Sequence, residues 1–143
     1  MTGRTTGSTT GRTTGSRRPA LRGEPGDNTV ELRGRVSSEP VQRELPSGVS
    51  ITTFRMSIPR ARTAMTAGSS QSVDWVDCAA WTARSRRTVS SWAVGDPVEV
   101  TGALRRRYFR SGDGSSTRLE IEVLTARRGR AADPGAEDEP GAT

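Results

Sequence analysis

The sequence predicts an all-β fold, a small five-stranded Greek-key barrel with one short helix between its third and fourth strands. Five segments in the middle of the chain alternate apolar and polar side chains with the period of two that half-buried strands show. A further segment, between the third and the fourth of these, has helical spacing and ends at Gly95. With 143 residues, of which 31% are apolar, the chain has enough for one such core.

The first two strands are expected before and after a turn. Residues 28–36 alternate valine, leucine and glycine on one face with glutamate and arginine on the other. Pro40 and the Pro-Ser-Gly turn at residues 46–48 interrupt this pattern. A second alternating segment runs over residues 51–58, and Pro59 ends it.

A third strand is expected over residues 73–81, after a polar loop at residues 60–72. Its inward face carries small residues, and Cys78 is expected to serve there as a small core hydrophobe. Trp75 and Trp81 are six residues apart, so both project from the opposite, outward face.

A helix over residues 83–94 follows, with Val89 and Trp92 turned toward the core. Two more strands are expected over residues 98–109 and 118–126, joined by a glycine-containing turn. On the fourth strand Leu104 belongs to the inward face, whereas Ala103 belongs to the outward face. Three strands, a helix and two more strands make up the order of a partly open barrel of the OB kind.

The two ends of the chain differ from this middle part. Residues 1–27 form a Thr/Gly/Arg-rich arm that repeats TTGS and TTGR, and residues 128–143 form an acidic tail without bulky apolar side chains. Both are expected to be disordered, which places the folded domain at residues 28–127. The arm is interpreted as a solvated tail or, alternatively, as a basic arm that helps to hold nucleic acid.

Charge and residue types exclude several functions. All 22 basic residues are arginines, and the net charge of +6 suits a polyanionic partner. The chain has no histidine and a single cysteine, which leaves no nucleophile relay and no soft metal site, so we expect no enzymatic activity, no cofactor and no metal. No segment resembles a signal peptide or a membrane helix, and the cytoplasm is therefore expected.

Aromatic side chains on the outward faces are the main functional signal. Trp75, Trp81 and, on the fourth strand, Phe109 lie outside among arginines. Flat exposed rings stack on unpaired bases while guanidinium groups meet phosphates. The alternative is that the tryptophans pack beneath a loop or in a subunit interface. The candidate nucleic-acid contacts are Trp75, Trp81, Phe109, Arg33, Arg35, Arg55, Arg62, Arg105 and Arg107.

Four segments, taken in order, resemble the bacterial single-stranded DNA-binding protein family (SSB). They are NTVELRGRV at residues 28–36, FRMS at 54–57, DWVDCAAW at 74–81 and GALRRRYF at 102–109. The resemblance implies an OB-fold, usually a homotetramer, that binds single-stranded DNA without sequence preference in replication, repair or recombination, associated with the nucleoid. It also implies stacking positions at Trp75, Trp81 and Phe109.

Three positions depart from the family pattern. Arg62 stands where many members have a further stacking tryptophan, and Asp77 stands on the binding face where a basic residue is commoner. The acidic tail ends in Gly141-Ala142-Thr143 in place of an apolar aromatic tip, so recruitment of partner enzymes through this tip is not expected. An RNA-binding or primosome-type OB module, or a protein-interaction domain that uses the aromatic face, is the alternative function.

Overall fold

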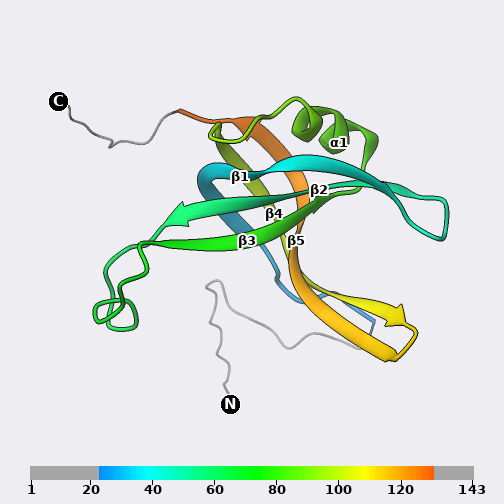
Figure 1. The fold of residues 1–143 in the computed structure, drawn as a ribbon, viewed down its shortest axis with the longest axis horizontal. Helices are drawn as coiled ribbons and strands as arrows, with labels where there is room; N and C mark the ends of the chain where they lie inside the picture. Colours follow the sequence, from blue (N-terminus) through cyan, green and yellow to red (C-terminus); the bar gives the residue numbers. More distant parts are fainter. Residues whose placement is uncertain (1–22, 131–143) are drawn as a thin grey trace, which may run out of the picture.

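Five strands close into a barrel, and one helix packs beside it (Figure 1). The computed structural model describes residues 23–130. This confirms the predicted five-stranded barrel with one helix between the third and fourth strands. The disorder expected at the chain ends concerns residues that lie, for the most part, outside the described range. The elements are β1 (Val30–Glu44), β2 (Ser50–Pro59), β3 (Val73–Ala80), α1 (Ala83–Ser90), β4 (Pro97–Ser111) and β5 (Gly114–Arg128).

The strands follow one another around the barrel in the order β1-β2-β3-β5-β4, and β4 returns to β1. The pair of β3 and β5 is parallel and places Cys78 beside Ile121, whereas the remaining pairs are antiparallel. Two glycines permit close approach of the backbones. A Cβ atom at Gly34 would overlap the carbonyl oxygen of Ser57, and one at Gly102 would overlap that of Glu122.

Strand β1 is longer than the sequence predicted. The expectation that Pro40 interrupts the pattern was wrong, because the strand continues to Glu44. It pairs with β4 up to Arg35 and with β2 beyond it, and its register with β2 shifts twice between Val36 and Val41. Proline lacks the N–H that a regular ladder needs, but irregularities of this kind accommodate it. The strand changes partner at Arg35, before these shifts, and the shifts lie in the part of β1 that pairs with β2 alone.

Helix α1 ends earlier than the expected residue 94. Thr82 caps its start by accepting a hydrogen bond from the N–H of Ser85, and its last residue is Ser90. A turn follows, in which the Asp96 carboxylate accepts from the N–H of Ala93 at 2.9 Å. This bond lowers the pKa of Asp96. In this turn the N–H groups of Ser91 and Trp92 donate to the carbonyls of Thr88 and Val89, three residues back, and Asp96 satisfies the N–H of Ala93.

The core lies between α1 and the inward faces of the strands. Val89 and Trp92 are buried, as predicted, and Trp92 is only 4% exposed. The Trp92 ring meets the Phe54 ring edge-on, with centroids 5.4 Å apart and an interplanar angle of 88°. The other members of this core cluster are Val36, Met56, Cys78, Ala80, Val98, Val100, Ile121 and Val123.

Strands β4 and β5 continue beyond the barrel as a two-stranded arm (Figure 1). The pairing of β1 with β4 stops at Gly102, beyond which β4 pairs with β5 alone. Leu104, predicted to be inward, is 48% exposed, while Ala103, predicted to be outward, is buried. The two faces exchange here because the register of β4 with β5 shifts between Thr101 and Gly102, just before these residues. The side chain of Asn28 binds both the N–H and the C=O of Leu104, at 2.9 and 2.8 Å, where β1 no longer pairs with β4.

Candidate nucleic-acid interface

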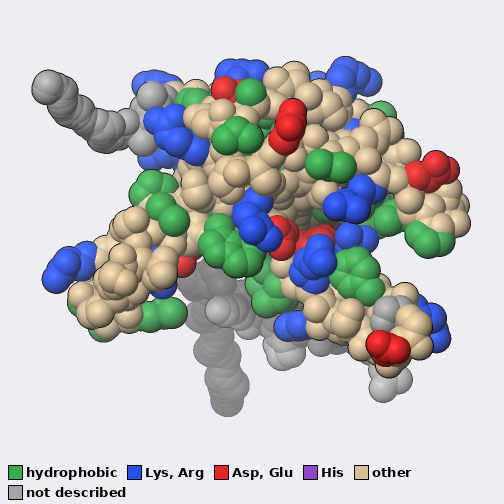
Figure 2. Space-filling model, viewed as in Figure 1, with side chains coloured by type: hydrophobic (Ala, Val, Ile, Leu, Met, Phe, Trp, Pro, Cys, Tyr) green, Lys and Arg blue, Asp and Glu red, His purple; other side chains and the backbone are tan. Residues whose placement is uncertain are grey.

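A groove of about 860 Å³ opens between the β1–β2 hairpin, strand β3 and the β4–β5 arm (Figure 2). Trp75 and Phe109 are the large aromatic side chains that line it near the surface. A second hollow of about 260 Å³ holds Trp81 and shares Arg107 and Glu120 with the first. We call the two together the aromatic groove, defined by its outer aromatic and charged residues: Trp75, Trp81, Phe109, Arg43, Arg55, Arg105, Arg106, Arg107, Arg118, Glu39, Glu44, Asp77, Glu120 and Glu122.

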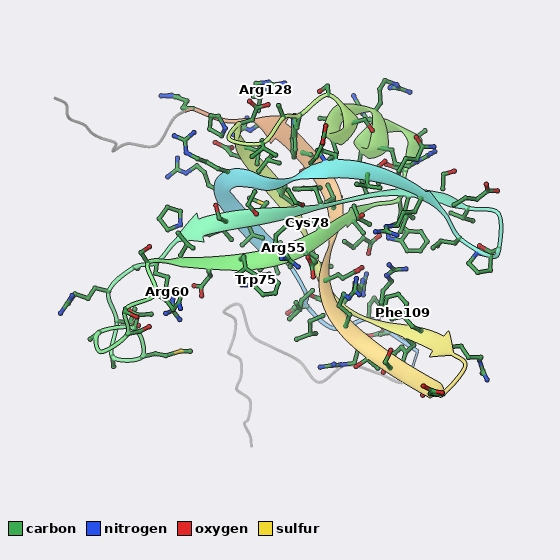
Figure 3. All side chains as sticks on the ribbon, viewed as in Figure 1. Arg55, Arg60, Trp75, Cys78, Phe109 and Arg128 are labelled. Carbon is green, nitrogen blue, oxygen red and sulfur yellow. The ribbon has the colours of Figure 1, made fainter. Side chains whose placement is uncertain are left out.

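Trp75 projects from β3 and is 58% exposed. The guanidinium carbon of Arg55, on β2, lies 4.0 Å from the centroid of its ring, and Figure 3 labels the two side by side. Arg55 faces Asp77 directly in the pairing of β2 with β3, and its Nε donates to Asp77 Oδ1 at 3.1 Å. A carboxylate across the strands thus holds a cation over one face of the Trp75 indole.

Arg107 lies between the rings of Trp81 and Phe109. Its guanidinium carbon is 5.7 Å from the Trp81 centroid and 4.8 Å from that of Phe109. Glu120, only 4% exposed, accepts from Arg107 Nε at 2.8 Å and from its terminal nitrogen at 3.4 Å. Arg118 adds a second cation 5.1 Å from the Phe109 centroid. A buried carboxylate therefore fixes a guanidinium between two aromatic rings, which keeps all three in place.

The larger part of the aromatic groove has no formal net charge. Four arginines line it, and four acidic residues stand beside them. Attraction of a polyanion therefore depends on single guanidinium groups at close range rather than on a broad positive field. These eight residues are Arg43, Arg55, Arg107 and Arg118 with Glu39, Glu44, Asp77 and Glu120.

Only some of the candidate residues share this groove. The structure brings together Trp75, Trp81, Phe109, Arg55, Arg105 and Arg107. Arg33 lines a different hollow formed by β1, β4 and β5, and Arg35 donates to the carbonyl of Gly95 at 2.8 Å. Arg62 is exposed on the loop between β2 and β3, outside the groove. The first half of β1 and its second half thus border different hollows of the barrel.

Several groove residues were not predicted from the sequence, among them Arg43, Arg118 and Glu120. Arg43 lies on the part of β1 beyond Pro40, where no strand was expected. Arg118 and Glu120 lie two residues apart on β5, so alternation alone places them on one face. Their contact with Arg107 on β4 can be predicted only when the register of the β4–β5 hairpin is known, and alternation along one strand does not give that register.

Cys78 lies beneath the aromatic groove and is buried, in agreement with its expected role as a core residue. Burial raises the pKa of its thiol to about 12, and the negative charges of Asp77 and Glu120 add to this. We expect Cys78 to resist a thiol reagent at pH 7 in the folded protein and to react fully in denaturant, because the thiolate is the reactive form. Rapid labelling of folded protein, measured by mass spectrometry, would contradict this expectation.

Within the described range, no group of three or more acidic or cysteine side chains is arranged so that it could hold a metal ion. Nor does the structure, between residues 23 and 130, contain a helix long and apolar enough to span a membrane. The chemistry that the groove offers consists of ring faces, guanidinium donors and carboxylate acceptors.

A closed five-stranded barrel whose outer groove interleaves aromatic rings with arginines defines an OB-fold protein with the features of a nucleic-acid interface. The chain belongs to the Single-strand binding protein family, whose model matches residues 27–128. Members of this family are non-enzymatic DNA-binding proteins, are usually oligomeric and typically form tetramers.

Individual relatives agree with this assignment. The single-stranded DNA-binding protein of Mycolicibacterium smegmatis is 31% identical over 107 residues, which cover 68% of this chain and 61% of the relative. Single-stranded DNA-binding protein 2 of Listeria monocytogenes is 25% identical over 116 residues, covering 81% of this chain and 70% of the relative. The chain thus spans about three fifths to seven tenths of the length of these relatives.

Two solved structures have the same fold. The small single-stranded DNA-binding protein of Streptomyces coelicolor superimposes with a TM-score of 0.51 and 25% identity, covering 71% of this chain and 93% of that one. The Plasmodium falciparum SSB complex with ssDNA superimposes with a TM-score of 0.58 and 22% identity, covering 73% and 94%. At that identity the second similarity concerns the fold alone.

Proposed function

We propose that this protein binds single-stranded DNA with little sequence preference, by stacking bases on Trp75, Trp81 and Phe109. One observation carries the proposal: three rings, from β3, from the residue that follows it and from β4, lie in the aromatic groove, each within 6 Å of a guanidinium group. Every base has a flat face that stacks on such rings, whereas base pairing in a duplex hides those faces. The mechanism needs no catalytic group.

Phosphates would meet the arginines of the groove. Arg55 and Arg105 each use Nε for a carboxylate, which leaves terminal N–H donors for a phosphate. Arg107 uses Nε and one terminal nitrogen for Glu120. The groove arginines proposed as contacts are Arg43, Arg55, Arg105, Arg107 and Arg118, and Arg33, Arg35 and Arg62 would contact phosphates where a longer strand leaves the groove.

We also propose the wider setting of this activity. Residues 28–127 carry the DNA-binding domain, and the chain acts in replication, repair or recombination. The proposed assembly is a homotetramer, and the proposed location is the cytoplasm in association with the nucleoid. Membership of the single-strand binding protein family supports each of these statements.

The experiment that tests the function compares three ligands of equal length at one salt concentration: oligo-dT, oligo-rU and duplex DNA. Oligo-dT is expected to quench tryptophan fluorescence strongly, since Trp75 and Trp81 would stack on bases, while the duplex has little effect. Tighter binding of oligo-rU would favour an RNA-binding or primosome-type module. Absence of binding to all three would leave the aromatic groove as a protein-interaction surface.

A further inference from the structure

We propose that Asp77 limits the affinity of the aromatic groove for DNA, by holding Arg55 on the face of Trp75 and by neutralising its charge. The inference rests on the proposed function, because it concerns how that same groove is regulated. Its starting point is the trio of Arg55, Asp77 and Trp75 on the adjacent strands β2 and β3. Figure 3 shows Arg55 and Trp75 next to each other on these strands, and both line the larger hollow of the groove.

The guanidinium of Arg55 occupies the place that a base needs. At 4.0 Å from the ring centroid it lies at stacking distance over the Trp75 indole. The same face of the ring cannot hold a base until Arg55 moves away. Asp77 opposes this movement, because its carboxylate accepts from Arg55 Nε at 3.1 Å directly across the strand pair.

The negative charge of Asp77 also weakens the binding of a phosphate in the groove. The larger part of the groove has four arginines and four acidic residues, so each carboxylate there cancels one cation. A phosphate that approaches Arg55 meets the repulsion of Asp77 at nearly the same distance. Removal of this one negative charge would leave the groove with a net positive charge and would free Arg55 for the phosphate.

Asp77 differs in this respect from Glu120, the other carboxylate that holds an arginine on an aromatic ring. Glu120 is only 4% exposed and its negative charge requires a partner, so it belongs to the structure of the groove. The Asp77 side chain is 26% exposed and its partner Arg55 is 45% exposed. An ion pair this accessible to water contributes little to folding, so Asp77 can be changed while the fold is kept.

The chain contains a matched control on the same two strands. Asp74 on β3 pairs with Arg60, next to the end of β2, with Asp74 Oδ1 and Arg60 Nε 3.1 Å apart. Asp74→Asn removes one negative charge, as Asp77→Asn does, at a position one residue from Trp75. Neither Asp74 nor Arg60 lines the aromatic groove. Loss of its charge alters the net charge of the protein as much as loss of the charge of Asp77.

The experiment compares wild-type protein with Asp77→Asn and Asp74→Asn in titrations with oligo-dT at several salt concentrations. Asp77→Asn is expected to lower Kd about threefold to tenfold at ~0.1 M salt and to steepen the slope of log K against log salt by about 0.7. Asp74→Asn should bind as the wild type does. In an Arg55→Gln background the gain from Asp77→Asn should largely disappear, since the released cation is then absent.

The outcomes separate the inference from the proposed function. If the wild type binds oligo-dT and Asp77→Asn binds no better, Asp77 does not limit affinity and the inference is overturned while the function stands. Equal gains for Asp77→Asn and Asp74→Asn would also overturn it, because the effect would then be one of net charge. If neither the wild type nor Asp77→Asn binds oligo-dT, the proposed function itself is wrong. Equal thermal unfolding midpoints would show that folding does not account for the difference.

Discussion

Replacement of Trp92 by alanine is expected to lower the free energy of unfolding by about 3 to 5 kcal/mol. The ring is 4% exposed and meets Phe54 edge-on in the centre of the core, so truncation leaves a cavity that the surrounding barrel cannot fill. The DNA affinity of the molecules that remain folded should be unchanged, because Trp92 lies outside the aromatic groove. Denaturant unfolding, followed by titration of the folded variant with oligo-dT, measures both quantities.

Trp81→Ala is the matched variant and should show the opposite pattern. Its ring is half-buried in the smaller hollow of the groove beside Arg107, outside the core cluster. Binding of oligo-dT should weaken by about 1 to 3 kcal/mol, the contribution of one stacked base, with little loss of stability. If Trp81→Ala instead unfolds the protein or dissociates its subunits while the folded fraction keeps its affinity, the tryptophan is a packing residue and the stacking mechanism fails.

Arg107→Met is expected to destabilise the protein by about 3 kcal/mol, because it leaves the carboxylate of Glu120 buried without its closest cation. Arg118, with a terminal nitrogen 3.8 Å from Glu120, compensates part of the loss. The same variant should weaken DNA binding, since the guanidinium between Trp81 and Phe109 is gone. Unfolding and binding are again measured separately.

A double variant separates the two roles of Arg107. Arg107→Met combined with Glu120→Leu removes both charges and should recover most of the lost stability, because an apolar pair of similar volume replaces a buried ion pair without a desolvation cost. DNA binding should remain weak. Recovery of both stability and affinity would show that Arg107 acts only through the fold. A loss of stability as large as in the single variant would show that the ion pair with Glu120 is not what stabilises this part of the arm.

Much of the fold was predictable from local pattern. A strand places successive side chains on opposite faces, so the alternation around Trp75 and Trp81 indicates that both are outward without any knowledge of the partner strands. The helical spacing that predicted Val89 and Trp92 to be inward depends in the same way on one segment alone, and both are buried although the helix itself ends at Ser90. The absence of histidine limits the chemistry that the side chains can perform, and it is evident from the sequence without a structure.

Which outward side chains meet was decided by the tertiary structure. Arg33 and Arg107 are both outward on alternating strands, yet only Arg107 shares a groove with the aromatic rings. The reason is that β1 changes partner from β4 to β2 near Arg35 and shifts register around Pro40, so its two halves border different hollows. Likewise, Glu120 reaches Arg107 through the register of the β4–β5 arm. Sequence alternation determines the face of a side chain, whereas bends and registers between distant segments determine its neighbours.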